Sequence, residues 1–384
     1  MYPTISDLLK DLFGINIPLP IQSFGFFVAI SFLLAAWTLT QELKRKEKSG
    51  LLKSHFKKTL HGKPATLSEL FFSGLIGFIV GYKIIFFVFN YDVLVSNPQQ
   101  ALLSTTGNIW GGIVIAAGSV YLKYREKEKT KKETPEWVEE EVHPYQLVGN
   151  ITIVSAIAGL LGAKIFHNLE NMGDFIKDPW GSLFSFSGLT MYGGLIVGGA
   201  AVIWYGIKNG IPVLHNCDSN APGLMLAYGF GRIGCQVAGD GDWGITNTLP
   251  KPHWMSFLPD WFWSYRYPHN VINEGVPIPN CAGRHCFMLD PPVFPTPLYE
   301  SIVCIALFLI LWSMRKKFTT PGMMFSVFLL MNGIERSFIE LIRVNTKYHV
   351  GGIEFTQAQL ISLLLIILGL TGIIYFRKKK LQTS

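Results

Sequence analysis

The sequence is poor in charged residues. Asp, Glu, Lys and Arg make up only 15% of its 384 residues, whereas 49% are hydrophobic. Several apolar runs of about 20 residues are each long enough to cross the hydrocarbon core of a bilayer. This composition is typical of a polytopic membrane protein, so a length-based count of soluble domains does not apply.

The chain also lacks the groupings that hold metals or nucleotides. Its nine histidines are scattered, and no two have the spacing of zinc ligands. The stretch Asp240–Asp242 resembles the start of a calcium loop but lacks the later glutamate. Gly229–Gly234 fits G-x-G-x-x-G, yet it lies in an apolar run rather than between a strand and a helix. We therefore expect no metal and no other cofactor.

A third absence concerns the start of the chain. The opening MYPTISDLLKDLFG has neither the basic start nor the cleavage site of a signal peptide, so the first apolar run is expected to stay. Nine spans are predicted in an all-α membrane bundle. They cover residues 21–40, 70–90, 107–122, 145–166, 188–206, 221–238, 297–314, 322–342 and 356–376.

Basic residues predict the orientation of these spans. Lys and Arg are concentrated in ELKRKEKSGLLKSHFKKTLHGK, KYREKEKTKK, MRKK and FRKKK, which a nine-span count places on one side. An excess of Lys and Arg marks the cytoplasmic side. The N-terminus is therefore expected outside and the C-terminus in the cytoplasm. The net charge of +7 follows from this topology and indicates no nucleic-acid partner.

A two-helix unit occurs twice in the sequence. Residues 74–86 match 156–167, which pairs Lys83 with Lys164, and residues 97–118 match 178–199. Both copies start from the same side, unlike the inverted repeats of many transporters. Each lysine is expected either to snorkel to the interface or to pair with a carboxylate.

The predicted organisation has four parts. They are residues 1–144 (N-terminal spans with an extra helical hairpin and cytoplasmic loops), 145–238 (core spans), 239–296 (an extracytoplasmic head) and 297–384 (C-terminal spans and a cytoplasmic tail). The loop 123–144 is expected to be solvated. The head is rich in Pro and Trp, which suits the membrane interface. Its Cys281 and Cys286 either form a disulfide or stay free.

Ionisable residues within the predicted spans indicate a functional site. Each costs at least ~2.5–3.5 kcal/mol in hydrocarbon. Arg232 interrupts the sixth span, and Glu300 begins the seventh. In the eighth, Arg336, Glu340 and Arg343 are spaced i, i+4 and i+7, which places them on one helical stripe. The arginines present planar donor forks that suit phosphate.

Two alternatives remain open for this cluster. Arg336 and Glu340 could form a purely structural ion pair. Glu335 lies about 100° from their stripe, since successive helical residues are offset by that angle, and could face elsewhere.

Four motifs resemble those of the prolipoprotein diacylglyceryl transferases. GRIGCQVAGDGDWG is similar to their signature G-R-x-G-N-F-x-N-x-E-x-x-G, and YGGLIVGG to H-G-G-L-I-G. FPTPLYE is similar to H-P-x-Q-L-Y-E, and NGIERSFIELIR to Y-x-x-x-R-x-x-x-E-x-x-R. The resemblance covers about residues 150–376, and the pair of spans at 70–122 would be additional to the family's seven.

The resemblance implies a reaction in a bacterial cell (inner) membrane. A diacylglyceryl group would move from phosphatidylglycerol to the lipobox cysteine of a preprolipoprotein, and a monomer would be enough. The catalytic residues implied are Arg232, Arg336, Glu340, Asp240 and Tyr192. The substrate-binding residues implied are Glu300, Tyr299, Arg343, Gly193, Gly194 and Asn332.

The sequence departs from the family at several motif positions. The positions of the motif histidines, asparagines, tyrosines, glutamine and glutamate hold Phe24, Tyr192, Cys235, Ala238, Asp240, Phe294, Pro297 and Asn332. The replaced groups include the candidate proton acceptors, and Glu340, Asp240 or Tyr192 would have to take that role. Two other hypotheses therefore remain. One is an inactive relative that binds phospholipid or signal peptides, and the other is a transporter or scaffold.

Overall fold

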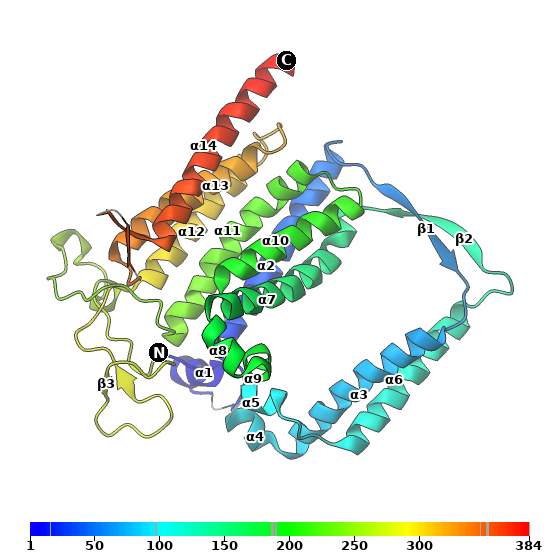
Figure 1. Ribbon diagram of the computed structural model, residues 1–384, viewed down its shortest axis with the longest axis horizontal. Helices are drawn as coiled ribbons and strands as arrows, with labels where there is room; N and C mark the ends of the chain where they lie inside the picture. The colour runs from blue at the N-terminus through cyan, green and yellow to red at the C-terminus, as the bar shows by residue number, and fades with distance from the viewer. Residues whose placement is uncertain are drawn as a thin grey trace.

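The computed structural model describes the chain except for residues 16, 97, 186, 187, 189, 346, 351, 352 and 384. Long helices lie side by side, and a helical hairpin stands apart from them (Figure 1). The predicted span 188–206 and the repeat segments 97–118 and 178–199 each include residues outside the described set.

The described elements follow one another in a mostly helical order. They are α1 (Ile5–Phe13), α2 (Ser23–Lys48), β1 (His55–His61), α3 (Leu67–Phe89), α4 (Tyr91–Ser96), α5 (Pro98–Leu103), α6 (Ile109–Thr130), β2 (Glu136–Val142), η1 (Pro144–Leu147), α7 (Val148–Glu170), α8 (Met172–Lys177), α9 (Pro179–Phe184), α10 (Met191–Lys208), α11 (Val213–Ala238), η2 (His253–Met255), η3 (Asp260–Phe262), β3 (Val276–Pro277), β4 (Phe287–Met288), α12 (Thr296–Met314), α13 (Met323–Ile339), η4 (Glu340–Ile342), β5 (Lys347–Val350), β6 (Ile353–Thr356) and α14 (Gln357–Thr383).

Six helices in the described part of the chain are long and apolar enough to cross a membrane: α2, α3, α7 with η1, α10, α12 and α14. The prediction of a polytopic helical membrane protein is thereby supported, whereas the count of nine spans is not. Helices also lie at the other three predicted spans, as α6, α11 and α13. These three helices are less apolar. Charged residues occur at the end of α6 (KYREKEKT), in α11 (Asp218 and Arg232) and in α13 (Glu335 and Arg336).

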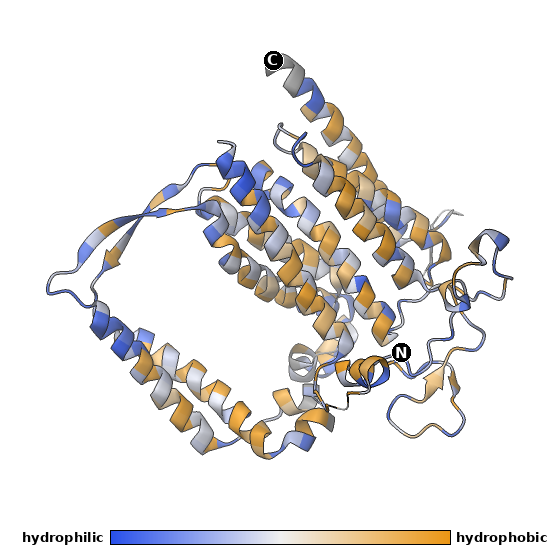
Figure 2. Ribbon diagram, turned by 180° about the vertical axis from the view of Figure 1, so that it is seen from behind, coloured by the Kyte–Doolittle hydropathy of each residue, from blue (hydrophilic) through white to orange (hydrophobic). Residues whose placement is uncertain are grey.

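Hydropathy is distributed along the helices as a bilayer requires. Apolar residues cover the middle of the long helices, and hydrophilic residues gather at their ends and on the strand ribbon (Figure 2). Many large apolar side chains on these helices are exposed in the isolated chain, such as Leu67, Val114 and Leu363. Such surface is compatible with a lipid solvent rather than with water.

The core bundle is built by α2, α7, α10, α11, α12, α13 and α14, with α11 packed against both α2 and α12. Between α11 and α12 lies a buried cluster that includes Met225, Cys304 and Leu311. The close approach depends on Gly229, because a Cβ there would lie 2.9 Å from the Ile305 side chain and 3.2 Å from the Ser301 carbonyl. Glycine thus lets α11 pass close to the start of α12, which positions the site described below.

The predicted two-helix repeat falls on two helical hairpins, α3–α6 and α7–α10. In the first, a Cβ at Gly81 would lie 2.4 Å from the Gly111 carbonyl. In the second, a Cβ at Gly162 would lie 2.5 Å from the Gly193 carbonyl. Both pairs of helices therefore meet at small residues.

The two repeat lysines act alike in these hairpins. The Lys83 ammonium donates to the carbonyls of Ala101 and Thr106, at 3.0 Å each, and Lys164 donates to the Ser185 hydroxyl at 2.8 Å. Each lysine thus binds the connection that follows its own helix. The acceptors in these contacts are carbonyl and hydroxyl oxygens rather than carboxylates. Carbonyl and hydroxyl acceptors close to the helix thus provide hydrogen bonds for the ammonium of each lysine.

An antiparallel ribbon of β1 and β2 joins the extra hairpin to the core bundle (Figure 1). Lysines of β1 face glutamates of β2, with Lys58 Nζ 3.3 Å from Glu139. The loop 123–144, expected to be solvated, is indeed exposed, but it contains an ordered strand. The sequence does not indicate this pairing, because the two strands are about 80 positions apart and an exposed, charged strand has the composition of a free loop. Two further short ribbons, β3–β4 and β5–β6, also depart from the all-α expectation.

The segment 239–296, predicted as a head, is irregular and contains only the short elements η2, η3, β3 and β4 among its described residues. Its small core contains Trp243, Tyr267, Leu289 and Val293. Cys281 and Cys286 form a disulfide, which resolves the alternative left open by their spacing. The Tyr267 hydroxyl donates to Gln236 of α11 at 2.6 Å, so the head is fixed to the end of that helix.

Asp218 of α11 caps the start of α13. Its two carboxylate oxygens accept the backbone N–H groups of Gly322 and Phe325, each at 2.8 Å, and the side chain is 4% exposed. We expect Asp218→Ala to destabilise the protein by about 1–2 kcal/mol, because buried N–H donors would lose their acceptors. Thermal unfolding in detergent checks this. Asp218→Asn retains one acceptor and is expected to lose less. An unchanged midpoint in the alanine variant would contradict the capping role.

Candidate functional site

Four segments converge at one end of the bundle: the end of α11, the loop after it, the start of α12, and the end of α13 with η4. Helix α11 stops at Gly239, whose φ of 66° lies in the left-handed region that favours glycine. The loop then passes Gly244, where a Cβ would lie 2.4 Å from the Ile342 carbonyl. Ile245 N–H donates to that same carbonyl at 2.8 Å. This contact holds the loop directly against η4.

Glu300, at the start of α12, is the centre of an ion-pair network and is fully buried. Its carboxylate lies 2.8 Å from Arg232 Nε, 3.0 Å from Arg336 Nη1 and 3.1 Å from Arg343 Nη1. The Tyr228 hydroxyl donates to it at 3.1 Å. One carboxylate therefore binds all three arginines that the sequence predicts at the site.

Two further carboxylates complete the network. Asp242 pairs with Arg232 and with Arg343, and both contacts are short. Glu340 lies 3.0 Å from Arg336 Nη2 and accepts the Thr356 hydroxyl and the Asn345 amide at 2.6 Å each. Three arginines thus face three carboxylates, so the predicted Arg336–Glu340 pair exists as part of a larger balanced cluster.

Asp242 is the residue that sequence reasoning missed. In the sequence, the DGD motif around it resembles only the start of a calcium loop. Its carboxylate joins α11 to η4 across a sequence separation of 101 residues, which no local spacing rule reveals. The signal that could have found it is charge balance, because three clustered arginines require more acid than Glu300 and Glu340 supply.

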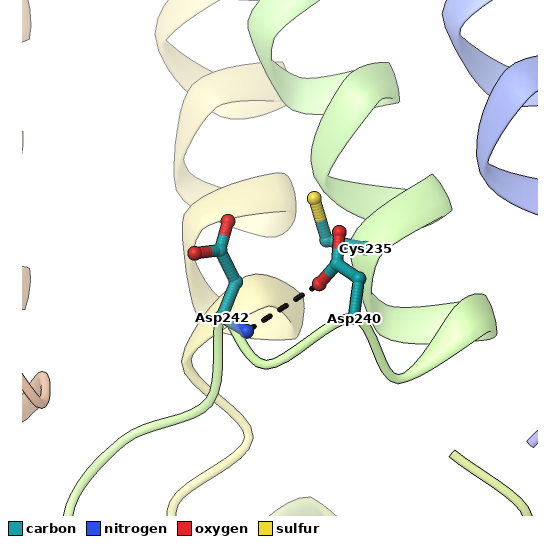
Figure 3. A group of neighbouring side chains, drawn as sticks. All are labelled: Cys235, Asp240 and Asp242. Atoms are coloured by element: carbon teal, nitrogen blue, oxygen red, sulfur yellow. Dashed lines mark hydrogen bonds between the residues drawn. The ribbon is translucent and has the colours of Figure 1, made fainter. Parts of the chain in front are cut away.

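Cys235, Asp240 and Asp242 lie together beside this network (Figure 3). Their ligand atoms are within 4.8 Å of one another. Asp242 is already bound by two guanidinium groups, and these positive charges disfavour a metal ion. The Asp242 backbone N–H donates to the Asp240 carboxylate at 3.4 Å. The trio is therefore better suited to share protons than to bind a cation.

The two aspartates of this trio differ in acidity. Burial raises the pKa of Asp240, and the nearby negative charge of Asp242 raises it further. Burial also acts to raise the pKa of Asp242, but Arg232 and Arg343 outweigh it and hold that pKa below its usual value. Asp242 is thus a fixed anion, whereas Asp240 is the carboxyl able to exchange a proton nearer neutral pH.

The other predicted site residues lie at varying distances from the cluster. Tyr299, on α12, donates its hydroxyl to the Phe262 carbonyl of η3 at 2.6 Å. Gly193 and Gly194, on α10, pack against α7. Tyr192 and Asn332 are half-buried on α10 and α13, and no hydrogen bond to the cluster is found for either within the described residues. The glycines serve helix packing in this structure, a role their motif does not distinguish from substrate binding.

A cavity of about 500 Å³ lies between α12 and α13 beside the cluster. Its lining is almost entirely apolar and includes Val303, Leu307 and Phe338. Glu335 is the acidic exception. It is 7% exposed, and its Oε2 atom has no hydrogen-bond partner among the described residues. The sequence left open where this side chain faces, and the structure places it at the wall of this apolar groove.

Comparison with known proteins identifies a family. The chain matches the model described as prolipoprotein diacylglyceryl transferase over residues 10–139 and 110–375. Three relatives are each named phosphatidylglycerol–prolipoprotein diacylglyceryl transferase. The Clostridium perfringens protein, number 2 of that name, is 30% identical over 61% of this chain and 79% of its own length. The Staphylococcus aureus protein (strain bovine RF122 / ET3-1) is 31% identical over 76% and 92%. The Leptospira interrogans protein (strain Fiocruz L1-130) is 24% identical over 100% and 97%.

Proposed function

The chain belongs to the prolipoprotein diacylglyceryl transferase family, and from this premise we propose that it transfers a diacylglyceryl group from phosphatidylglycerol to the cysteine thiol of a preprolipoprotein lipobox. The observation that supports this function best is the cluster of Arg232, Arg336 and Arg343 around the buried Glu300, beside an apolar groove. A phospholipid has matching parts, an anionic phosphate and apolar chains.

The chemistry requires positive charge at the site. The cysteine sulfur forms a bond to a glycerol carbon while the bond from that carbon to the phosphate oxygen breaks. The electron pair leaves with the oxygen, so a phosphodiester with one negative charge becomes a phosphomonoester approaching two. Fixed guanidinium groups stabilise this growing charge more in the transition state than in the ground state.

The ion pairs within the cluster do not exhaust its donors. Each guanidinium has five N–H donors, more than the contacts found here engage. We assign Arg232 and Arg336 to the lipid phosphate, and Arg343, Glu300 and Glu340 to holding them in place. The groove between α12 and α13, which Tyr299 helps to line, would take an acyl chain.

The thiol must lose a proton before it attacks. Among the three candidates from the sequence, Glu340 is occupied by Arg336, Thr356 and Asn345. No contact of Tyr192 with the cluster is found in the described part of the chain. We therefore favour Asp240, whose pKa burial and Asp242 raise. A carboxylate with a raised pKa is a stronger proton acceptor than an ordinary aspartate.

This assignment predicts a pH dependence. Asp240 accepts a proton only when ionised, so the transfer rate is expected to rise as pH increases through its raised pKa. Asp240→Asn should lower the rate by about 100-fold and remove that acidic limb. Initial rates measured between about pH 4 and about pH 8 test this, because this range extends from ordinary carboxyl pKa values towards those of thiols. An unchanged acidic limb in the variant would assign the proton acceptor elsewhere.

We also propose the membrane topology that the basic segments indicate. Helices α6, α11 and α13 would cross together with the six more apolar helices, which gives nine spans. The N-terminus would lie outside and the C-terminus in the cytoplasm of a bacterial inner membrane. The head would lie at the outer interface, and residues 145–238 with 297–384 would form the catalytic bundle. A monomer contains every group the proposal uses.

The first experiment is an assay with purified protein in detergent, phosphatidylglycerol and a lipobox peptide. Mass spectrometry should detect a peptide with one diacylglyceryl group on its cysteine. Absence of the adduct, from folded protein that binds phosphatidylglycerol, would favour the inactive lipid-binding relative. That alternative draws support from the cluster itself, because its arginines are already balanced by carboxylates.

A further inference from the structure

A second charged site lies at the opposite end of the bundle, where the last turns of α2 and α12 meet. Its pocket of about 490 Å³ is lined by the basic side chains Lys44, Arg45, Lys48, Arg315 and Lys316 and by two tryptophans. No carboxylate lines it within the described residues. From these features we propose that this pocket binds the phosphate of an anionic phospholipid in the cytoplasmic leaflet.

A buried glutamate organises the pocket. Glu42 of α2 is 0% exposed, and its carboxylate accepts Arg45 Nε at 3.0–3.1 Å. Arg315 Nε, from the end of α12, lies 3.7 Å from the same carboxylate. One buried anion therefore holds two arginines from different helices at the same opening. Burying it costs free energy that the two cations offset, and each guanidinium keeps further N–H donors.

The aromatic wall fixes the orientation of Arg315. Its guanidinium carbon lies 3.6 Å from the centre of the Trp312 ring, and Nη1 donates to the Trp312 carbonyl at 2.6 Å. Trp37 of α2 stacks on Trp312 with ring centres 5.8 Å apart. A stacked arginine retains its outer N–H edge for a phosphate. Tryptophans settle at the headgroup level of a bilayer.

Charge identifies the class of ligand. Five cations surround one pocket, whereas Glu42 beneath them supplies one negative charge. Such a concentration of like charge is unfavourable until an anion enters it. Both helix ends belong to the basic segments that predict the cytoplasmic side, where anionic lipids attract polybasic sites. The site is remote from the Glu300 cluster and does not depend on the proposed transfer reaction.

The test counts lipids bound to the full-length protein. Native mass spectrometry would measure retention of phosphatidylserine and of phosphatidylcholine, each added to protein in detergent. The test variant is Lys48→Gln/Lys316→Gln, because both lysines are exposed and neither is bound to Glu42 in the described contacts. The matched control is Lys378→Gln/Lys379→Gln, which removes two charges from the end of α14 outside the pocket.

We expect the test variant to retain phosphatidylserine about tenfold less than the wild type, while the control variant matches the wild type. The Glu300 cluster is intact in all three proteins, so lipid bound there contributes equally. Equal losses in the two variants would mean unspecific attraction and would overturn the proposal. Retention of phosphatidylcholine equal to that of phosphatidylserine by the wild type would also overturn the proposal. Full displacement by millimolar inorganic phosphate would identify a free anion rather than a lipid as the ligand.

Discussion

Replacing Glu300 with alanine is expected to lower the free energy of unfolding by about 3–5 kcal/mol, the cost of breaking a buried ion pair by removing one partner. Glu300 is bound to Arg232, Arg336 and Arg343, and all three would lose a carboxylate within a low-dielectric interior. The midpoint of thermal unfolding of the purified protein measures this loss.

Glu139→Ala provides the matched control. Glu139 pairs with Lys58 on the exposed ribbon, with 59% of its side chain accessible, and surface pairs contribute little. The control should leave the midpoint unchanged. Glu300→Gln is expected to fall between the two, because the amide oxygen still accepts hydrogen bonds but carries no charge. A Glu300→Ala protein as stable as the control would mean that lipid or solvent compensates the arginines.

Replacing Arg336 with alanine is expected to reduce diacylglyceryl transfer by about 100- to 1,000-fold, in line with the loss of one group that stabilises developing negative charge. The protein should stay folded, because the two glutamates that pair with Arg336 keep their other hydrogen-bond or ion-pair partners. Glu300 retains Arg232 and Arg343, and Glu340 retains the Thr356 hydroxyl and the Asn345 amide. Thioether formation on a lipobox peptide, followed by mass spectrometry, is the measurement.

Two further variants separate charge from geometry at Arg336. Arg336→Lys keeps the positive charge but removes the planar fork of N–H donors. If this variant is partly active, the lost part of the activity is assigned to bidentate binding. Arg266→Ala is the control, since Arg266 pairs with Asp290 on the surface of the head at 3.1 Å. Full activity of Arg336→Ala would exclude this arginine from the reaction and direct attention to Arg232.

Helical periodicity was sufficient to predict most of the charged site. The i, i+4, i+7 spacing predicted Arg336, Glu340 and Arg343 together, and all three join the network around Glu300. The predicted helical stripe is wrong in detail, because α13 ends at Ile339, Glu340 lies in η4 and Arg343 has extended backbone. Periodicity failed for Asp242, because a loop residue has no face to be counted on. Periodicity also left open where the Glu335 side chain faces. The angle between two residues around a helix axis does not identify the neighbouring helix that each residue contacts.

Long-range pairing was the other limit of prediction. The duplicated hairpins could be recognised because each is local in sequence and repeats its glycines. The pairing of strands β1 and β2 could not be predicted, because the whole α3–α6 hairpin lies between them in the sequence. The YGGLIVGG motif posed a different problem. Gly193 is in close contact with α7, so the same residues serve helix packing and cannot be assigned to a ligand by pattern alone.

The ribbon that holds the extra hairpin has a consequence for sidedness. Because β1 and β2 are antiparallel, the chain leaves the core and returns to it at the same end of the bundle. A pair of helices placed there preserves parity: every later helix keeps the direction it would have without that pair. A single extra helix would instead invert all that follows, and the Glu300 cluster would open on the wrong face. Even-numbered growth is thus the form of expansion that leaves the chemistry of such a bundle on its original side.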